Sequence, residues 1–516
     1  MNLTTDAWIP IVWKDGRPGT VGLLDAFRRG HEIQDLAVRP HERIAMMRLL
    51  ICIAQAALDG PVDYEAWKTC CPSVAPATLD YLTRWCNLFE LFGDAQRFAQ
   101  VPKLKKAGNG TDAEEGNESS KLDLALATGN AATLFDNAGG STRIFTPSEL
   151  ALMLTTFQCF SPGGRIGVAQ WGGKDTSGEG AAEHAPCLAG SMLHALLRGD
   201  SLLTTVHKNL MNKEQAESFF GPGRWGRPSW EAMPRGLEDG EAIRNATTTY
   251  LGRLVPLSRA IHLADDGQSL ILANGLEYPS FSDGWREPSS TVVTRTFKGQ
   301  AARAVLPTSV EKAVWRELHA LLVKSVGQNP GGPAALQNVT QDQDALDLWV
   351  GGLAARQAKL VDTNESVFHV PAAMLNTASQ RVYEAGVLLA NRTELRLRRA
   401  VSVYHGALGD DLDRPEAKNR RQQIQNNATT RFWTDTELAV PHLLEIASAP
   451  GTLGSNNEWH KTTWGRTIWS AARTAYEGAC PHQTPRHMQA YALGLKTLFS
   501  APSSAQEDET DKEAEA

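Results

Sequence analysis

Residues 371–407, PAAMLNTASQRVYEAGVLLANRTELRLRRAVSVYHGA, form a long amphipathic stretch that predicts a helix and decides the fold class of the C-terminal region. Three further helical stretches follow at about 414–448, 456–479 and 484–499, and short polar breaks separate them. Pro441 should kink or divide the second stretch. Because short connections make neighbouring helices antiparallel, the four stretches predict a four-helix bundle.

The residues before this region predict a mixed domain. Trp8–Trp13 and residues 291–297 have the composition of strands, whereas His41–Leu58 reads as an apolar helix. After about residue 300 we expect helices to take over. The predicted fold class is therefore α+β. We expect a large mixed α/β domain over 1–364, a C-terminal four-helix bundle over 365–501 and a disordered acidic tail over 502–516.

The net charge of −7 at first argues against a nucleic-acid partner. However, six acids and one lysine between Glu507 and Glu515 contribute −5, so the remainder of the chain carries only −2. Basic residues also gather around one connection between the predicted helices, among them Arg396, Arg399, Arg420 and Arg421. This cluster fits a basic patch and a solvated helix face of mixed charge equally well.

Cysteine content and the N-terminal sequence bear on the compartment. The seven cysteines include no CxxC pair, which argues against a disulfide framework and a zinc knuckle. The N-terminus lacks the basic start and apolar run of a signal peptide, and no stretch reaches about 18 uninterrupted apolar residues. We therefore expect a soluble, cytoplasmic protein without a membrane partner.

The catalytic motifs in the sequence lack the context that they need. Gly221–Gly226 matches G-x-G-x-x-G, but a helical segment precedes it where a dinucleotide site requires a strand. Gly167–Gly172 has P-loop spacing, but Gly-Lys-Asp follows where Gly-Lys-Ser/Thr is required. None of the 13 histidines has ligand spacing. We predict no catalytic residue, metal or cofactor, although a site assembled from distant loops would leave the same pattern.

Residues 351–359, GGLAARQAK, suggest a different kind of site. Glycines permit φ > 0 and close approach to a partner, and Gln357 can both donate to and accept from base edges. Arg356 and Lys359 can hold phosphates on either side. The segment therefore has the composition of a wedge for a nucleic-acid duplex. It fits an ordinary loop that enters a helix as well.

Four other segments accompany residues 351–359 in a fixed order. They are DAWIP at 6–10, ATGNAATLFDN at 127–137, SPGGRIG at 161–167 and TRFWTDTE at 430–437. Together, and over nearly the whole chain, these segments resemble the large subunit of type I-E CRISPR Cascade complexes, the CasA family.

The resemblance implies a role in antiviral defense that involves DNA and RNA binding. The large subunit of this family does not cut nucleic acid. It recognises the PAM in duplex DNA, wedges the duplex open to start R-loop formation and helps to recruit a helicase–nuclease, while guide pairing reads the target. The expected partners are crRNA, the backbone, small and crRNA-end subunits of Cascade, the target duplex and the helicase–nuclease. The alternatives are a stand-alone hydrolase and a pure protein scaffold without DNA readout.

Carried over by position, the resemblance assigns roles to individual residues. The PAM wedge comprises Arg356, Gln357 and Ala358, and the glycine loop at the minor groove comprises Gly163, Gly164 and Gly167. The loop toward the crRNA end comprises Asn130, Leu134, Phe135 and Asn137. Contacts to the DNA backbone are expected from Lys298, which resembles a basic position of the family. From their charge and clustering alone, they are also expected from Lys359, Arg396, Arg399, Arg420 and Arg421.

One departure from the family concerns direct readout of the PAM. Some members touch the PAM with a lysine finger, and the corresponding segment here, Leu276–Asp283, contains no lysine. We therefore expect a relaxed or altered PAM preference.

Overall fold

The computed structural model describes residues 1–94, 96–107, 116–126, 143–164, 166–178, 185–297, 300–325, 327–340, 344–356, 359–409, 414–453 and 458–500. By its internal contacts the chain divides into two units. The first comprises Met1–Val314, Val323–Thr340 and Leu346–His369, and the second comprises Trp315–Leu322, Gln341–Ala345 and Val370–Ala516. The domain boundary that we predict at residue 364 lies inside the last strand, β14 (Lys359–Pro371).

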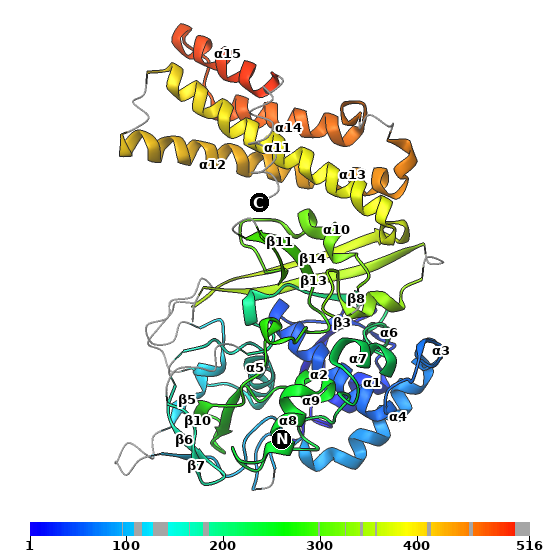
Figure 1. Ribbon diagram of the computed structural model, residues 1–516. Coiled ribbons are helices and arrows are strands. Elements are labelled where there is room, and N and C mark those ends of the chain that lie inside the picture. The colour runs from blue at the N-terminus through cyan, green and yellow to red at the C-terminus, as the bar shows by residue number, and fades with distance from the viewer. Residues whose placement is uncertain are drawn as a thin grey trace. The chain divides into compact units, whose positions relative to one another are not determined.

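The first unit is built around helix α2 (Pro40–Leu58), whose side chains are buried along most of its length. Helices α4 (Cys71–Trp85), α5 (Pro147–Phe160) and α9 (Tyr250–Leu254) pack against α2, as Figure 1 shows. The predicted apolar helix at 41–58 is thus confirmed. The other helices of this unit are α1 (Leu23–Arg28), α3 (Tyr64–Thr69), α6 (Leu202–Lys208), α7 (Lys213–Phe220) and α8 (Gly240–Thr248).

The described strands form five small sheets. The first contains β1 (Ile9–Trp13) between β2 (Pro18–Val21) and β3 (Ile33–Leu36), which confirms the predicted N-terminal strand. Two sheets have the orders β5-β10-β9 and β4-β6-β7, and their strands are β4 (Lys105–Lys106), β5 (Asn117–Glu118), β6 (Ala169–Trp171), β7 (Lys174–Asp175), β9 (Arg259–Leu263) and β10 (Ser269–Asn274). The others are the hairpin β11 (Val292–Phe297)–β12 (Gln300–Val305) and the sheet β14-β13-β8, with β8 at His194–Arg198 and β13 at Ala345–Arg356.

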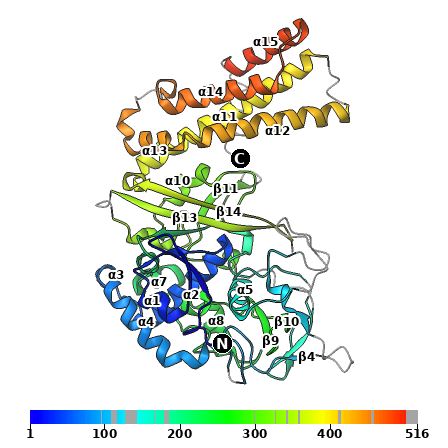
Figure 2. The ribbon, with the colours of Figure 1, turned by 180° about the vertical axis from the view of Figure 1, so that it is seen from behind.

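The expectation that helices take over after residue 300 is wrong. Strands β12, β13 and β14 follow, and the long pair β13 and β14 lies side by side in Figures 1 and 2. The Gly351-Gly352 pair, which has the composition of a loop, lies inside β13 and is buried. Neither glycine has a positive φ. The group that approaches Gly352 closely belongs to this chain. A Cβ on Gly352 would lie 2.0 Å from Thr308 Oγ1 and 2.9 Å from the Met192 carbonyl oxygen.

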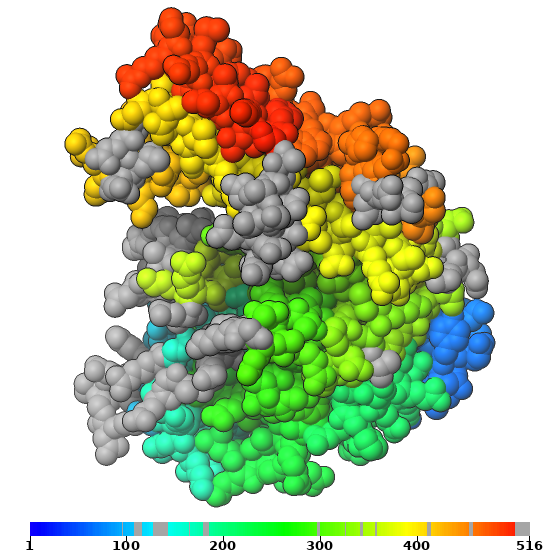
Figure 3. Space-filling model, turned by 45° about the horizontal axis from the view of Figure 1, so that its top comes forward, coloured from blue at the N-terminus to red at the C-terminus, as the bar shows by residue number. Residues whose placement is uncertain are grey.

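The second unit is helical, as we predict. Its helices are α10 (Leu318–Leu321), α11 (Thr377–Ala407), α12 (Pro415–Glu437), α13 (Val440–Ser448), α14 (Thr463–Ala479) and α15 (Pro485–Phe499). The predicted second stretch is divided, with Pro441 in the first turn of α13. Helix α11 packs against α12, α13, α14 and α15, and Figure 3 shows α15, in red, on the surface of this unit. The helical region is confirmed, and the four-helix bundle stays a prediction.

The described residues also bear on the rejected motifs. Gly221–Gly226 follow helix α7, so the strand that a dinucleotide loop requires is absent at this point. Within the described ranges, no three histidine, cysteine or acidic side chains converge in a way that could hold a metal ion. The helices of the described chain include none with the length and apolar character needed to cross a bilayer.

Candidate nucleic-acid interface

The hairpin of β13 and β14 carries the predicted wedge. Strand β13 ends at Arg356 and β14 begins at Lys359, and both of these side chains are exposed. Gln357 and Ala358 connect the two strands in sequence and lie outside the described residues. The structure therefore places Arg356 of the predicted wedge and the basic residue Lys359 at the facing ends of the two strands.

A serine fixes the backbone next to this tip. The Ala355 amide donates to Ser191 Oγ at 2.9 Å, and the Ser191 hydroxyl donates to the Ala355 carbonyl oxygen at 3.1 Å. Leu353 and Ala354 just before it are buried. Both backbone polar groups of Ala355, the residue before Arg356, are thus held by Ser191, which suits a rigid element more than a flexible loop.

A chain of charged contacts anchors the base of the same hairpin. The Trp349 indole donates to Glu365, and Arg43 Nε lies 3.4 Å from the Glu365 carboxylate. Asp35 of β3 accepts from Arg43 and, at 2.7 Å, from Arg198 of β8. These contacts tie β13 and β14 to the N-terminal sheet and to α2.

Replacing Gly352 tests this packing. We expect Gly352→Ala to lower the free energy of unfolding by roughly 1–3 kcal/mol, because its Cβ would overlap Thr308 Oγ1, which packs against β13. Chemical denaturation measures the change. Gly240→Ala is the matched control, since a Cβ on Gly240 meets nothing within 4 Å. An equal change in the free energy of unfolding for both substitutions would contradict the close packing of Gly352 against Thr308.

The glycine loop lies on a buried arginine. It follows α5, and Gly167 bridges Ala273 of β10. Arg259 donates to the Pro162 carbonyl oxygen and, at 2.6 Å, to Asn274 Oδ1. Burial lowers the pKa of this guanidinium to about 10. Of the three predicted loop glycines only Gly164 has a positive φ, at 122°, so its backbone alone requires glycine.

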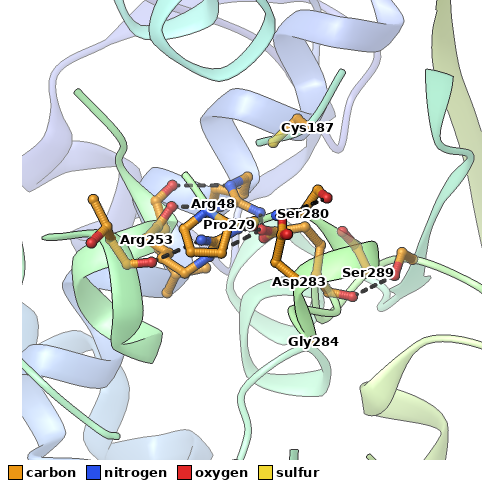
Figure 4. A network of polar contacts seen from close by, with 12 residues as sticks. Arg48, Cys187, Arg253, Pro279, Ser280, Asp283, Gly284 and Ser289 are labelled. Atoms are coloured by element: carbon orange, nitrogen blue, oxygen red, sulfur yellow. Dashed lines mark hydrogen bonds and ion pairs between the residues drawn. The ribbon is translucent and has the colours of Figure 1, made fainter. Parts of the chain in front are cut away.

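The segment Leu276–Asp283, which contains no lysine, lies next to a buried ion network (Figure 4). Glu287 accepts from Arg48 at 2.7 Å and from Arg253 at 2.6 Å, and all three side chains are almost fully buried. Arg253 also donates to the Pro279 carbonyl oxygen at 3.0 Å. The network therefore connects α2 and α9 to the turn that carries Ser280 and the rest of this segment.

The electrostatics of this network favour the charged form of Glu287. Burial alone would raise the pKa of its carboxyl, but the Arg253 and Arg48 guanidinium groups outweigh burial and lower the pKa to about 2. Glu287 is thus an anion between two cations at every physiological pH.

Comparison with known proteins assigns this chain to a family. The family model described as CRISPR-associated protein Cse1 matches residues 2–475. The chain belongs to the Cse1 family, also called CasA. It is 26% identical over 522 residues to the CasA/Cse1 protein of Thermus thermophilus, covering 96% of this chain and 95% of that protein.

Solved structures of Cse1 proteins share the fold. The Cse1 structure from Acidimicrobium ferrooxidans is 19% identical with a TM-score of 0.74, covering 100% of this chain and 98% of the other. A chain of a CRISPR RNA-guided surveillance complex is 18% identical with a TM-score of 0.69, covering 97% and 99% of the two chains. The mixed α/β architecture with a helical C-terminal region is therefore the Cse1 fold.

The other predicted site residues of this Cse1-family chain are distributed as follows. Asn130, Leu134, Phe135, Asn137 and Lys298 lie outside the described residues. Arg396 and Arg399 lie half-buried on α11, and Arg420 and Arg421 lie on the neighbouring helix α12. Arg396 also stacks over Trp469, with its guanidinium carbon 5.5 Å from the ring centroid. The structure thus places the four arginines on two packed helices of the second unit.

Several residues that shape the site are invisible to sequence reasoning. Ser191, Arg259 and Arg253 act through partners that are far away along the chain, and no local motif surrounds them. Ser191 has a positive φ of 51°, which an L-residue seldom adopts, but this signal exists only in three dimensions.

Two buried histidines near α2 and β8 give this unit a pH dependence. The His194 Nε2–H donates to the Cys187 carbonyl oxygen at 3.0 Å, so its Nδ1 accepts from the Ser289 hydroxyl. Within the described chain, neither ring nitrogen of His41 has a hydrogen-bond partner. Burial lowers the pKa of His194 to about 4 and that of His41 to about 3. Both histidines are therefore neutral in the folded protein.

We expect the free energy of unfolding to fall as the pH drops from about 6.5 to 4. The unfolded histidines bind protons in this range while the folded ones do not, so each removes about 1.4 kcal/mol per pH unit. Urea unfolding at several pH values measures the slope. His41→Gln should make it shallower, whereas exposed His31→Gln should not. A flat profile over this range would contradict the assignment.

Proposed function

We propose that this Cse1-family chain is the non-catalytic large subunit of an RNA-guided type I-E Cascade complex. In this role it recognises the PAM in duplex DNA and opens the duplex next to it. The observation that carries the proposal is the hairpin tip, where exposed Arg356 and Lys359 flank Gln357 on a backbone held by Ser191.

The tip has the chemistry that duplex opening requires. Separating neighbouring base steps costs a few kcal/mol, which contacts to the backbone and the growing guide heteroduplex offset. Gln357 and Ala358 would enter the duplex, while Arg356 and Lys359 hold phosphates. A rigid support favours this action, because a flexible tip would lose the free energy of ordering when it enters.

Readout of the PAM would come from the minor groove. Gly163, Gly164 and Gly167 present little side-chain bulk, which suits a groove about 6 Å wide. The turn at Ser280 supplies no lysine there, so we propose a relaxed or altered PAM preference. The buried network of Arg48, Glu287 and Arg253 would fix the position of this turn.

The remaining roles concern assembly in the cytoplasm. We propose that the loop with Asn130, Leu134, Phe135 and Asn137 contacts the crRNA end and neighbouring Cascade subunits. The helical unit, as a four-helix bundle, would guide DNA through Arg396, Arg399, Arg420 and Arg421, with Lys298 and Lys359 on the first unit. The complex would then recruit the helicase–nuclease.

Binding of duplex libraries tests the function. The crRNA-loaded complex is assembled with and without this chain and exposed to duplexes with a randomised PAM at fixed salt. We expect PAM-dependent binding only when the chain is present. Binding that is indifferent to the chain would leave a protein scaffold as the better account, and metal-dependent turnover of phosphoesters by the purified chain would indicate a hydrolase.

A further inference from the structure

A large open cleft lies in the first unit, in a part of the chain to which the proposed function gives no role. It encloses about 1150 Å³ between the β6–β7 turn, the segment before β4 and the loop that leads into α8. Helix α8 is labelled in Figures 1 and 2, strand β6 in Figure 1 and strand β4 in Figure 2. This volume exceeds what a single small ligand needs and suits an extended one.

Four cationic side chains line this cleft. Lys103 and Lys105 come from the segment at β4, and Arg227 and Arg235 come from the loop before α8. All four are exposed, and none of them forms an ion pair with another described residue. Their charges are therefore available to a ligand.

Two of the three carboxylates of the cleft accept hydrogen bonds from the protein itself. Glu231 accepts the hydrogen bond of the Tyr81 hydroxyl. Asp239 caps α8 and accepts from the Arg235 amide at 3.2 Å. Glu241 is the third acidic side chain of the lining, so four cations face three carboxylates, and the net charge of +1 favours an anion.

Backbone contacts hold the main chain at two of the cationic residues. Asn245 Oδ1 accepts from the Arg227 amide at 2.9 Å, and Asn245 Nδ2 donates to the Arg227 carbonyl oxygen at 2.9 Å. Lys105 lies in β4, paired with Gln170 of β6. A Cβ on Gly172 would lie 2.5 Å from Gly236 Cα, so only glycine lets the β6–β7 turn lie this close to the loop before α8.

Apolar surface lies between these charges. Pro102, Met233 and Pro234 line the cleft together with the four cations. Such a surface can receive the sugar and base faces of an unpaired strand, whereas a duplex turns its bases inward and offers phosphates alone. Grooves that bind single strands without sequence preference combine cations with surfaces on which bases stack, and here proline and methionine side chains supply the apolar surface.

We propose that this cleft is a second nucleic-acid site that binds a single-stranded phosphodiester segment without reading its sequence. The site goes beyond the proposed PAM function, which involves the β13–β14 tip and the glycine loop. A strand would follow the cleft, with phosphates toward Lys103, Lys105, Arg227 and Arg235.

Fluorescence anisotropy of the full chain with labelled single strands of about 12 nucleotides tests the site. We expect Arg227→Ala/Arg235→Ala to weaken binding roughly tenfold at low salt and to lower the salt slope by about 1.4, since each phosphate contact contributes about 0.7. Lys103→Ala/Lys105→Ala, on the other side of the cleft, should weaken binding and lower the salt slope by similar amounts. The matched control is Lys68→Ala/Arg84→Ala, which removes two exposed cations from α3 and α4.

RNA and DNA strands of one sequence identify the source of the ligand. Equal affinities support recognition of the phosphate backbone, and tighter RNA binding adds a contribution of the 2′-hydroxyl. The proposal would be overturned by an unchanged salt slope in both cleft variants or by an equal loss of affinity in the control variant. Tighter binding of a duplex of the same length would also overturn it. PAM-dependent binding by the assembled complex is measured separately, so failure of the cleft leaves the hairpin account unaffected.

Discussion

Glu287→Gln is expected to lower the free energy of unfolding by roughly 3–5 kcal/mol. The substitution keeps the shape of the side chain but removes the charge that Arg48 and Arg253 share at 2.7 and 2.6 Å. Two buried guanidinium groups would then face each other without a counter-charge. Urea unfolding of the purified chain measures the loss.

Two comparisons make this expectation specific. Glu32→Gln breaks an exposed pair with Arg29 and should leave the unfolding midpoint nearly unchanged. The pKa of Glu287 is lowered from 4.5 to about 2, so its contribution is complete above pH 4.5 and is lost as the pH falls toward 2. A similar stability of Glu287→Gln and wild type at neutral pH would show that the network does not support this unit.

Gln357→Ala is expected to weaken binding of the assembled complex to PAM-bearing duplex by roughly ten- to hundredfold. Binding to a single-stranded target of the same sequence should change little, because no base pairs need to be opened. The reason is the position of Gln357 between Arg356 and Lys359, which end and begin the two strands of the supported hairpin.

Gln268→Ala is the matched control, since it removes the same amide from an exposed turn of the same unit. Its affinity for both targets should equal that of wild type. Equal losses on duplex and single strand in Gln357→Ala would contradict the wedge and indicate a general contact to nucleic acid.

The helices were the most predictable part of the fold. The apolar run at 41–58 and the amphipathic run after residue 371 determine their own conformation, because helical contacts are local in sequence. Strand β13 was missed because its glycine pair resembles a loop. Its conformation depends on Thr308 and Met192, which lie close to it only in the folded chain.

The candidate site shows the same division between local and distant information. The roles proposed for Arg356 and Lys359 come from neighbouring residues and from the family resemblance, and they stay a prediction. The residues that support the hairpin tip and the turn at Ser280 could not be predicted. Ser191 meets Ala355, and Arg253 meets Pro279, across long stretches of sequence that carry no shared motif. Buried arginines such as Arg259 also look like surface residues until the fold is known.

The most direct test of the central claim is the fluorescence of a 2-aminopurine base placed next to the PAM in a target duplex. The base brightens when it loses its stacking partners. We predict a rise on mixing with the crRNA-loaded complex that contains this chain, and no rise with Gln357→Ala even at saturating concentrations. An equal rise with both proteins would show that the duplex opens without the hairpin tip and would contradict the account.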